Sequence, residues 1–497
     1  MEGRHVSLWL DTSGPPAAYP PLDGDQRFDV AVVGAGITGL TAALLLARAG
    51  RSVAVLDHHV VGGGSTGHST AKVTSQHGLT YARLRLTHGR DAARTYADAM
   101  ETAKERIAAF AGEGIECAFR ERSAYLYGSA SWQRPLIERE AEAAAQAGLP
   151  AAFVETTPLP FKVHGAVRFD DQAEFDPYAY CGGLARLISE AGGTVFEHTR
   201  ARQVHEGDVC RVETERGSVH ADHVVVATLM PFLDRGGFFT RAYGNRSYCV
   251  SARIDGPPPE GMFINAGSPT RSIRAHDDLL IVGGEGHHTG SDKAQPERYE
   301  ALIEFARRHW DVRSIEHRWS AQDFSPDDGV PFAGRLHLRS RRVFVATGLK
   351  KWGITAGTAA AMLISDTILD RENPWSGLFS STRVRPQELP RFALENTRVG
   401  IRFFADRVKH RGSRPIEDLK PGEGAIVSSA GHKVAGYRDD EGVLHAVSSR
   451  CTHLGCQVVW NAAERTWDCP CHASRFAVDG EVLNGPAVDP LEQRPVA

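Results

Sequence analysis

Four of the chain's eight cysteines gather with two histidines between residues 451 and 472, and this cluster constrains the fold of the C-terminal region. The spacing is Cys451-x-His453 followed by Cys469-x-x-His472, so each of two loops supplies one thiol and one imidazole. Two thiolates with two imidazoles suit either a zinc ion or a two-iron cluster of mixed ligation. Zinc fingers usually place both cysteines before both histidines, an order that this sequence does not follow. The spacing therefore favours the two-iron cluster and leaves zinc as the alternative.

The sequence CTHLGC…CPCH resembles the Rieske ferredoxin domains of the cytochrome bc type, and the resemblance covers residues 412–497. In a Rieske [2Fe–2S] centre, two histidines replace two cysteines on one of the irons. The resemblance implies an all-β domain in which residues 484–487 (NGPA) form a loop over the cluster. It also implies four metal ligands and one disulfide between the loops, namely Cys451, His453, Cys469 and His472 as ligands and Cys456 with Cys471 as the disulfide.

Two positions after the last histidine bear on the reduction potential of this centre. Histidine ligation and hydrogen bonds to the cluster sulfurs both raise the potential. High-potential members of the family carry a serine two residues after the last histidine and a tyrosine two residues further on. Here Ser474 is present, but Phe476 stands in place of the tyrosine. We therefore expect a potential below that of respiratory Rieske centres.

Net charge, apolar runs and the N-terminal residues indicate the compartment in which we expect the protein. The formal net charge of -4 gives no reason to expect nucleic-acid binding. No apolar run reaches membrane-spanning length, and the N-terminus lacks the apolar region of a Sec-type signal peptide. We therefore expect a cytoplasmic protein without a membrane span, whose thiols stay reduced unless they have a special role. Four cysteines scattered singly are expected to be buried thiols: Cys117, Cys181, Cys210 and Cys249.

Far upstream, residues 28–57 predict a strand, a glycine-rich turn, a helix and a second strand. The pattern Gly34-x-Gly36-x-x-Gly39 opens the helix, and Asp57 ends the second strand. In such a unit the glycines allow a tight turn, close approach of the backbone to a pyrophosphate, and packing of helix on strand. The helix N-terminus attracts the phosphates. We therefore expect Asp57 to bind a ribose hydroxyl and the whole turn to bind a dinucleotide, through Gly34, Ala35, Gly36, Ile37, Thr38 and Gly39.

The rest of the chain divides by periodicity and by breaker residues. Residues 81–148 predict helices, and residues 210–228 predict a hairpin that feeds a buried strand. Residues 245–333 predict mostly strands and loops, and residues 341–369 predict another strand, glycine turn and helix. Weak periodicity at 376–395 predicts a linker. A docking helix is expected after it, with a membrane-surface helix as the alternative, having Ile401, Phe404 and Val408 on one face and Arg398, Arg402 and Arg407 around it.

Three further segments distinguish FAD from NAD. They are the loop GGGSTGHSTAKVTSQHG at 62–78 and two strand ends, VVVAT at 224–228 and VFVATGLKKWGITAG at 343–357. With the glycine turn they resemble the D-amino-acid oxidase-like FAD oxidoreductases, which include glycine-, sarcosine- and dimethylglycine-oxidising enzymes. They also look like a bacterial subgroup with this same Rieske fusion. The resemblance implies further FAD contacts at Asp57, His58, Ser65, Thr66, His68, Ser69, Thr70, Ala227, Gly348, Gly353, Ile354 and Thr355.

The implied fold class is an α/β FAD-binding domain (Rossmann-like, GR2-type) with an α+β substrate domain, followed by the all-β Rieske domain. Residues 1–380 would form the FAD-dependent oxidoreductase, residues 381–411 the linker and docking helix, and residues 412–497 the Rieske domain. Within the first part, the FAD-binding segments are expected at about 28–80, 170–235 and 334–375. The substrate domain is expected at about 81–169 and 236–333.

Three residues are candidates for the substrate site: His77, Arg274 and Thr355. Arg274, expected just before a strand that is followed by His287 and His288, is either an anchor for an anionic substrate group or a structural arginine. Some sarcosine-oxidising relatives bind the substrate carboxylate with a lysine where this chain has Thr355, which disfavours a simple N-methyl amino acid. His68 matches the residue that bonds covalently to flavin in dimethylglycine-type relatives, although a non-covalent contact is the simpler expectation.

The two implied cofactors together predict a redox relay. A reduced flavin holds two electrons, whereas a Rieske cluster accepts one. We expect oxidation of a small amine or amino acid by hydride transfer to FAD, then single-electron transfer to the cluster and to an external acceptor. The alternatives are reverse flow, in which a donor protein reduces the cluster, and a non-catalytic electron-transfer module. The sequence has no second dinucleotide unit for NAD(P)H, which disfavours a self-contained NADPH-driven reductase. It also lacks the His/carboxylate array that holds the mononuclear iron of a Rieske oxygenase, which disfavours that class.

Overall fold

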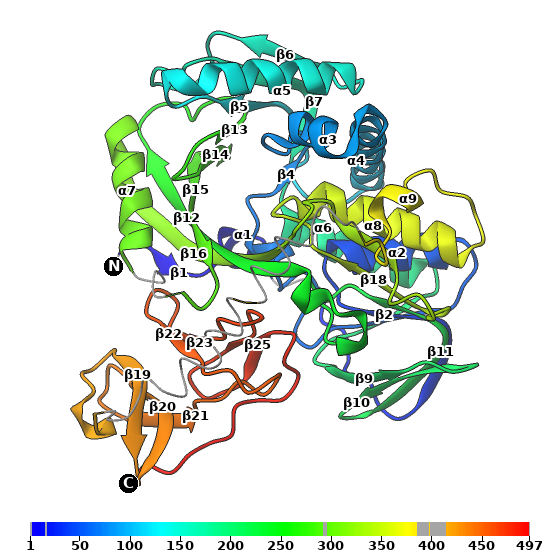
Figure 1. The fold of residues 1–497 in the computed structure, drawn as a ribbon, viewed down its shortest axis with the longest axis vertical. Coiled ribbons are helices and arrows are strands. Elements are labelled where there is room, and N and C mark those ends of the chain that lie inside the picture. Colours follow the sequence, from blue (N-terminus) through cyan, green and yellow to red (C-terminus); the bar gives the residue numbers. More distant parts are fainter. Residues whose placement is uncertain (1, 15–16, 292–295, 385–396, 398–413, 497) are drawn as a thin grey trace.

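The structure is a computed structural model that describes residues 2–14, 17–291, 296–384, 397 and 414–496. An eight-stranded sheet lies on the right in Figure 1. The strand order is β17-β18-β11-β2-β3-β8, and β10 and β9 continue from β11. The parallel strands are β2 (Gln26–Val33), β3 (Val53–Leu56), β8 (Thr194–Phe196), β11 (Gly217–Val226) and β18 (Val343–Thr347). The antiparallel additions are β9 (Ala201–His205), β10 (Cys210–Thr214) and β17 (Phe332–Arg335).

Strand β2 is apolar because both of its faces are covered. Val30 and Val32 pack in the same core as the helices α2 (Ile37–Arg48), α6 (Pro177–Glu190) and α8 (Gly353–Ile368). Ala31 and Val33 pack in a second core with the strands β9, β10 and β11. Parallel strands buried on both faces read as continuous apolar runs rather than as alternating ones. The predicted strand–turn–helix–strand unit, the hairpin at 210–228 and the last strand–turn–helix unit are confirmed.

A second, mostly antiparallel sheet of ten strands lies beside the first, in the order β1-β16-β12-β15-β14-β13-β5-β7-β4 with β6 on β7 (Figure 1). We call it the roof sheet. Helix α7 covers its outer face, and α3, α4 and α5 lie around its far end. The strands are β1 (Arg4–His5), β4 (Lys72–Val73), β5 (Arg120–Tyr127), β6 (Ala151–Val154), β7 (Ala166–Glu174), β12 (Ala242–Ile254), β13 (Met262–Asn265), β14 (Arg271–His276), β15 (Leu279–His288) and β16 (Val312–Pro326). The other helices are α1 (Leu8–Thr12), α3 (Thr80–His88), α4 (Arg90–Ala111), α5 (Arg134–Gln146), α7 (Glu297–His309) and α9 (Ser376–Phe379).

The roof sheet corrects several expectations from the sequence. The segment 81–148 is not wholly helical, because β5 pairs with β7 and β13 in its middle. The segment 245–333 contains the amphipathic helix α7, which buries Tyr299 and Leu302. Arg274 precedes the strand β15 as expected but itself lies within β14, and His287 and His288 end β15 rather than follow it. Both β4 and β7 belong to the roof sheet although they fall inside or across the expected FAD-binding segments.

The start of the expected linker belongs to the flavin domain. Residues 376–379 form α9, Ser381 Oγ donates a hydrogen bond to the Arg335 carbonyl, and Arg383 forms a buried ion pair with Asp328. These contacts tie the chain down as far as residue 383. The expected docking helix, with Ile401, Phe404 and Val408, lies outside the described residues and stays a prediction.

The C-terminal domain is all β, as expected, and consists of two small sheets. The first contains β19 (Gly424–Ser429), β20 (His432–Arg438) and β21 (Leu444–Ser448). The second contains β22 (Val459–Asn461), β23 (Thr466–Asp468), β24 (Arg475–Phe476) and β25 (Val482–Asn484). Figure 1 shows the second sheet next to the flavin domain and the first sheet further away. The domain therefore meets the flavin domain through the sheet that carries the second pair of predicted ligands.

Candidate functional site

The glycine turn has its shape because Gly34 and Gly39 carry no side chain. Gly34 has a φ of +108°, and a Cβ there would lie 2.6 Å from the Ala227 carbonyl oxygen. A Cβ on Gly39 would lie 1.9 Å from the Gly34 carbonyl oxygen, so only glycine lets α2 start this close to the turn. Gly36 is the N-cap of α2 and leaves the first amides of the helix facing a cavity. The turn is therefore shaped as the sequence predicts for a dinucleotide.

Asp57, at the end of β3, helps to hold the turn. Its carboxylate accepts hydrogen bonds from the backbone N–H of Ala35 at 2.7 Å and of His59 at 2.9 Å. Burial acts to raise the pKa of Asp57, but contacts with His58 and with these two amides outweigh it and hold the pKa below its ordinary value. The carboxylate is thus charged and lines the same cavity as the turn.

One long cavity of about 910 Å³ runs from this turn to the roof sheet and on to the C-terminal domain. Most of the predicted FAD contacts line it, namely Gly34, Gly36, Ile37, Thr38, Asp57, His58, Ser65, Thr66, His68, Ser69, Thr70, Ala227, Gly353 and Ile354. Ala35, Gly39, Gly348 and Thr355 do not line it, because they shape the turns behind its wall. A single cavity of this size with a dinucleotide turn at one end fits an extended cofactor together with a small substrate.

Of the three substrate-site candidates, only His77 reaches the cavity. Its Nδ1 is 2.7 Å from the Tyr96 hydroxyl, its Nε2 is 2.9 Å from the Thr74 carbonyl oxygen and 3.1 Å from Thr355 Oγ1, and its ring stacks on Trp352. Burial lowers the pKa of His77 to about 3, so the imidazole is neutral. Both ring nitrogens are already hydrogen-bonded, so His77 would have to break one of these bonds to act as a base. Thr355 supports His77 from behind the wall.

Arg274 has a structural environment. It is 1% exposed, and its Nη1 donates to the carbonyl oxygens of Thr70 and Ala71, while its Nε pairs with Glu174 at 3.3 Å. It does not line the cavity. Of the two roles considered for Arg274, this placement supports the structural one, since the arginine ties the early flavin loop to β7.

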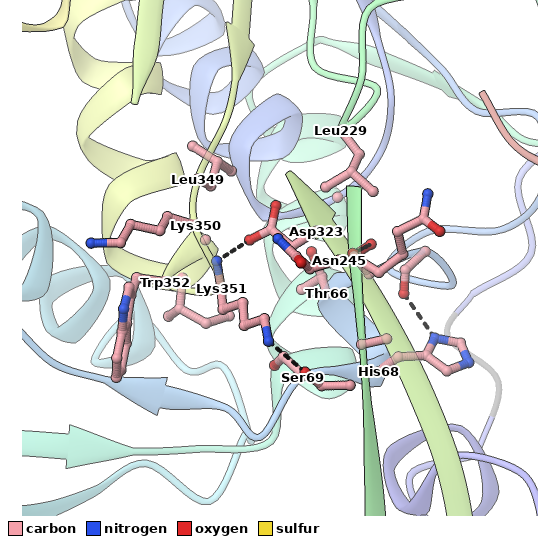
Figure 2. Close-up of a pocket in the computed structure, with 18 of the residues that line it drawn as sticks. Thr66, His68, Ser69, Leu229, Asn245, Asp323, Leu349, Lys350, Lys351 and Trp352 are labelled. Carbon is pink, nitrogen blue, oxygen red and sulfur yellow. Dashed lines mark hydrogen bonds between the residues drawn. The ribbon is translucent and has the colours of Figure 1, made fainter. Parts of the chain in front are cut away.

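Sequence reasoning missed the lysines that line the cavity. Lys350 and Lys351 stand together in left-handed backbone conformations, with φ of +55° and +67°. Figure 2 shows their side chains pointing to different sides, with Asp323 accepting from the Lys351 backbone N–H. Burial raises the pKa of Asp323 to about 6. The two lysines between Gly348 and Gly353 were a visible signal, because ammonium groups are rarely placed beside a buried glycine turn.

Lys72 and Lys351 bring positive charge to the roof side of the cavity. Lys72 Nζ, on β4, contacts the hydroxyls of Ser272 and Thr70, and burial together with Arg274 lowers its pKa to about 7. Lys351 Nζ donates to Ser247 Oγ at 2.6 Å. Neither lysine forms an ion pair with a carboxylate among the residues that the structure describes. The nearby carboxylates of Glu174 and Asp323 act on the ammonium groups of these two lysines only without direct contact, which suits a ligand that carries an anionic group.

The predicted cluster ligands meet between two loops of the C-terminal domain. The thiols of Cys451 and Cys469 are buried and hydrogen-bond to each other, and this contact lowers the pKa of Cys451 below its ordinary value. The Nδ1 atoms of His453 and His472 are buried and have no hydrogen-bond partner in the part of the chain that the structure describes. Unpartnered imidazole nitrogens are costly unless they bind a ligand, and thiolates are the form that binds iron. This donor set therefore fits a Rieske cluster.

The groups next to the four predicted ligands also fit a Rieske cluster. Cys456 and Cys471 form the disulfide that joins the two loops. Their sulfurs lie within 4.8 Å of the Cys469 sulfur, but two of these three sulfurs are bonded to each other and do not offer a metal site of their own. Ser474 is fully buried, hydrogen-bonds to the Cys451 sulfur, and accepts from the Ala487 N–H at 3.0 Å. Residues 485 and 487 of the expected NGPA cover line the long cavity as well.

The fold and these two sites define a flavin-dependent oxidoreductase with a Rieske iron–sulfur domain. The chain belongs to the FAD dependent oxidoreductase (DAO) family, which matches residues 29–367, and the Rieske [2Fe-2S] domain family matches residues 413–495. The protein therefore binds FAD and a [2Fe–2S] cluster, and zinc is no longer needed to explain the cysteines. Among the described residues, no helix is both long enough and apolar enough to cross a membrane.

Comparison with individual proteins agrees with this assignment. The chain is 35% identical over 98% of its length to the Bacillus subtilis protein YhfW, whose name describes a Rieske 2Fe-2S iron-sulfur protein and of which the match covers 97%. The glycine oxidase of Geobacillus kaustophilus has the same fold over 72% of this chain and 99% of that chain, with a TM-score of 0.63 at 20% identity. The L-proline dehydrogenase of P. horikoshii matches over 73% of this chain and 98% of that chain, with a TM-score of 0.60 at 17% identity.

Proposed function

We propose that the protein is a dehydrogenase that oxidises the C–N bond of a small amino acid and passes the electrons singly to an external acceptor. The observation that carries this proposal is the single cavity whose walls include the dinucleotide turn, the two lysines of the roof side and residues 483–485, 487 and 488 of the Rieske domain. FAD, when bound, accepts a hydride, and the [2Fe–2S] cluster takes one electron at a time. A shared cavity supports a function in which both groups serve one reaction.

The roof side of the cavity favours an amino acid over a plain amine. Lys72 and Lys351 would each donate hydrogen bonds to a substrate carboxylate, and a cationic amine without a carboxylate would be repelled by them. Position 355 is a threonine behind the wall, so an anchoring lysine at that position is replaced by lysines from β4 and from the turn after β18. This supports a carboxylate-bearing substrate, although Thr355 by itself disfavours a simple N-methyl amino acid.

The chain supplies orientation rather than a strong base. His77 is neutral and held by Tyr96 and Thr355, and Asp323 is held by backbone amides. An amine that arrives neutral needs no base to release a hydride. The residues of the site would therefore act by binding the carboxylate and by fixing the substrate against the flavin loop.

An anaerobic titration of the purified holoprotein tests this proposal. Small amino acids, N-methylated amino acids and the matching amines without a carboxylate are added in turn, and the flavin absorbance and the electron paramagnetic resonance of the cluster are followed. We expect amino acids to bleach the flavin and the cluster signal to appear with it. If no compound reduces the flavin, but a reduced ferredoxin-type donor reduces the cluster and then the flavin, electrons flow in the reverse direction and the proposal is wrong.

A further inference from the structure

The loops that hold the cluster lie against the flavin domain, and one buried carboxylate of the Rieske domain anchors the contact. This carboxylate belongs to Glu464, in the turn between β22 and β23. Strand β23 leads from Glu464 directly into the ligand Cys469. The position of Glu464 is therefore coupled to the position of the second ligand loop over a few residues of strand.

Among the described residues, the groups that hydrogen-bond to the Glu464 carboxylate all come from the flavin domain, whereas its backbone N–H donates to Asn461 Oδ1 of the Rieske domain. Its carboxylate accepts from the Tyr299 hydroxyl at 2.6 Å, from Ser320 Oγ, and from Arg246 Nη2 at 3.1 Å, and His5 Nε2 lies 3.4 Å away. These partners come from α7, β16, β12 and β1, so Glu464 reaches across the edge of the roof sheet. The Glu464 side chain is 9% exposed in this contact.

Glu464 is the carboxylate that contacts Arg246 directly, and the buried Asp468 of β23 also favours the charged guanidinium. The Arg246 side chain is 3% exposed, and its Nε and Nη1 have no hydrogen-bond partner among the described residues. Its ion pairs within the described part of the chain are to Glu464. Removing one member of a buried ion pair is unfavourable because the other charge is left without a partner. An arginine buried in this way makes sense in a surface that is covered, not in one that is open to water.

Glycines of the flavin domain leave room for the ligand loop. A Cβ on Gly244 would lie 2.3 Å from the Ala473 Cβ, and a Cβ on Gly290 would lie 2.5 Å from Pro470. Between them, Gln322 Nε2 donates to the Ala473 carbonyl oxygen at 2.8 Å. The loop 470–473 therefore fits a recess that any side chain at position 244 would fill.

In this position the flavin domain covers both histidine ligands. The Phe239 ring lies 5.2 Å from the His453 ring and 4.8 Å from the His472 ring, and Asp234 Oδ1 is 2.9 Å from His453 Nε2. The His453 side chain is 4% exposed and His472 is 8% exposed. A second protein thus has no direct access to the histidine side of the centre.

We propose that Glu464 is the docking residue that holds the histidine side of the cluster against the flavin domain, so that this side serves electron exchange within the chain and admits a redox partner protein only when the dock opens. This docking role of Glu464 requires the FAD and Rieske sites, but it does not depend on which substrate the protein oxidises. In the exchange with a partner protein, one electron passes from the reduced cluster to the partner, and no bond is made or broken.

Hydrogen–deuterium exchange of the full holoprotein tests the dock directly. The variants are Glu464→Gln and Gly244→Ala, and the matched control is Glu441→Gln, since Glu441 is an exposed carboxylate on the turn between β20 and β21. We expect both interface variants to keep FAD and iron and to take up deuterium faster at residues 234–240 and 469–474, and the control to behave like the unaltered protein. Because Gly244→Ala changes no charge, it decides the matter if Glu464→Gln fails to fold.

A comparison of two oxidants tests the functional part. The cluster is reduced with dithionite without oxygen, and the loss of its paramagnetic signal is timed after mixing with ferricyanide or with oxidised cytochrome c. We expect cytochrome c to oxidise the cluster about tenfold faster in both interface variants, because more molecules have the histidine side free. Ferricyanide should oxidise all forms at rates within about twofold, since a small ion needs no such opening. Equal cytochrome c rates in all forms, or unchanged deuterium uptake, would overturn the proposal.

Discussion

The dinucleotide turn and the cluster loops both hold a redox group, but they do so by opposite means. The turn at 34–39 works because side chains are missing, as the distance of 1.9 Å from a Gly39 Cβ to the Gly34 carbonyl oxygen shows. The cluster loops work through side chains, with two thiols, two unpartnered imidazole nitrogens and a disulfide between the loops. An added side-chain atom at Gly34 or Gly39 is therefore expected to disrupt the turn. The loss of a thiol or an imidazole is expected to disrupt the cluster site.

The roof side of the cavity differs from both the dinucleotide turn and the cluster loops. Lys72 and Lys351 act through charge rather than shape, and they contact hydroxyls, not carboxylates. Changes there should alter affinity for the substrate and leave both cofactors in place. The three regions thus predict three separable losses, of FAD, of iron and of substrate affinity.

The largest effect is expected from Gly39→Ala. The added Cβ would overlap the Gly34 carbonyl oxygen, and relieving that overlap costs on the order of 3 kcal/mol in unfolding free energy. We expect FAD binding to weaken by more than about tenfold while the iron content stays unchanged. Flavin absorbance, iron assay and thermal unfolding measure this. Gly377→Ala is the control, because a Cβ there meets no atom within 4 Å. Full FAD occupancy in Gly39→Ala would contradict the shape-based account of the turn.

Cys469→Ser should give the converse result. Even groups one step removed from a metal are worth roughly 10- to 100-fold in affinity, so losing a ligand should abolish the cluster. We expect iron and acid-labile sulfide to disappear and the flavin absorbance to remain. Cys210→Ala serves as the control, since Cys210 is a buried thiol that belongs to neither site. If Cys469→Ser also loses FAD, the two sites are not separable as proposed.

A smaller effect is expected from Lys351→Met and Lys72→Met. A hydrogen bond to a charged group is worth about 1.5–3 kcal/mol, which corresponds to a KM raised roughly ten- to a hundredfold for a carboxylate-bearing substrate. FAD and iron content should not change. Steady-state kinetics with an amino acid and with its amide separate charge from shape. Lys433→Met, at an exposed lysine of β20, is the control. An unchanged KM in both variants would remove the lysines from the substrate site.

The smallest effect is a pH dependence that comes from Lys72. Its pKa of about 7 means that the ammonium form, which binds a carboxylate, is lost as the pH rises through that value. We therefore expect KM for an anionic substrate to rise above about pH 7, by at most about tenfold per pH unit. Lys72→Arg should abolish this rise, because arginine stays protonated. A KM that falls with rising pH would have the wrong sign for this assignment.

Local patterns in the sequence were sufficient for both cofactor sites. The glycine turn and Asp57 lie within one strand–turn–helix–strand unit, and the four ligands lie in two loops of one small domain, so short-range spacing already places them together. For the same reason the disulfide pairing, implied by resemblance, agrees with the structure. These features depend on few residues, and their neighbours along the chain are also their neighbours in space.

The substrate side and the interdomain contact depend on strand pairing over long distances. Lys72 comes to Ser272 only because β4, β7, β5, β13 and β14 lie in one sheet, and Arg274 becomes structural through its pairing with Glu174 of β7. Glu464 contacts Arg246 only because the Rieske domain lies at the edge of the roof sheet. The sequence by itself determined which redox groups the protein holds, since glycine turns and ligand loops are local. Tertiary structure alone decided which charges line the cavity and which face each other, because register between distant strands sets the face on which each side chain lies.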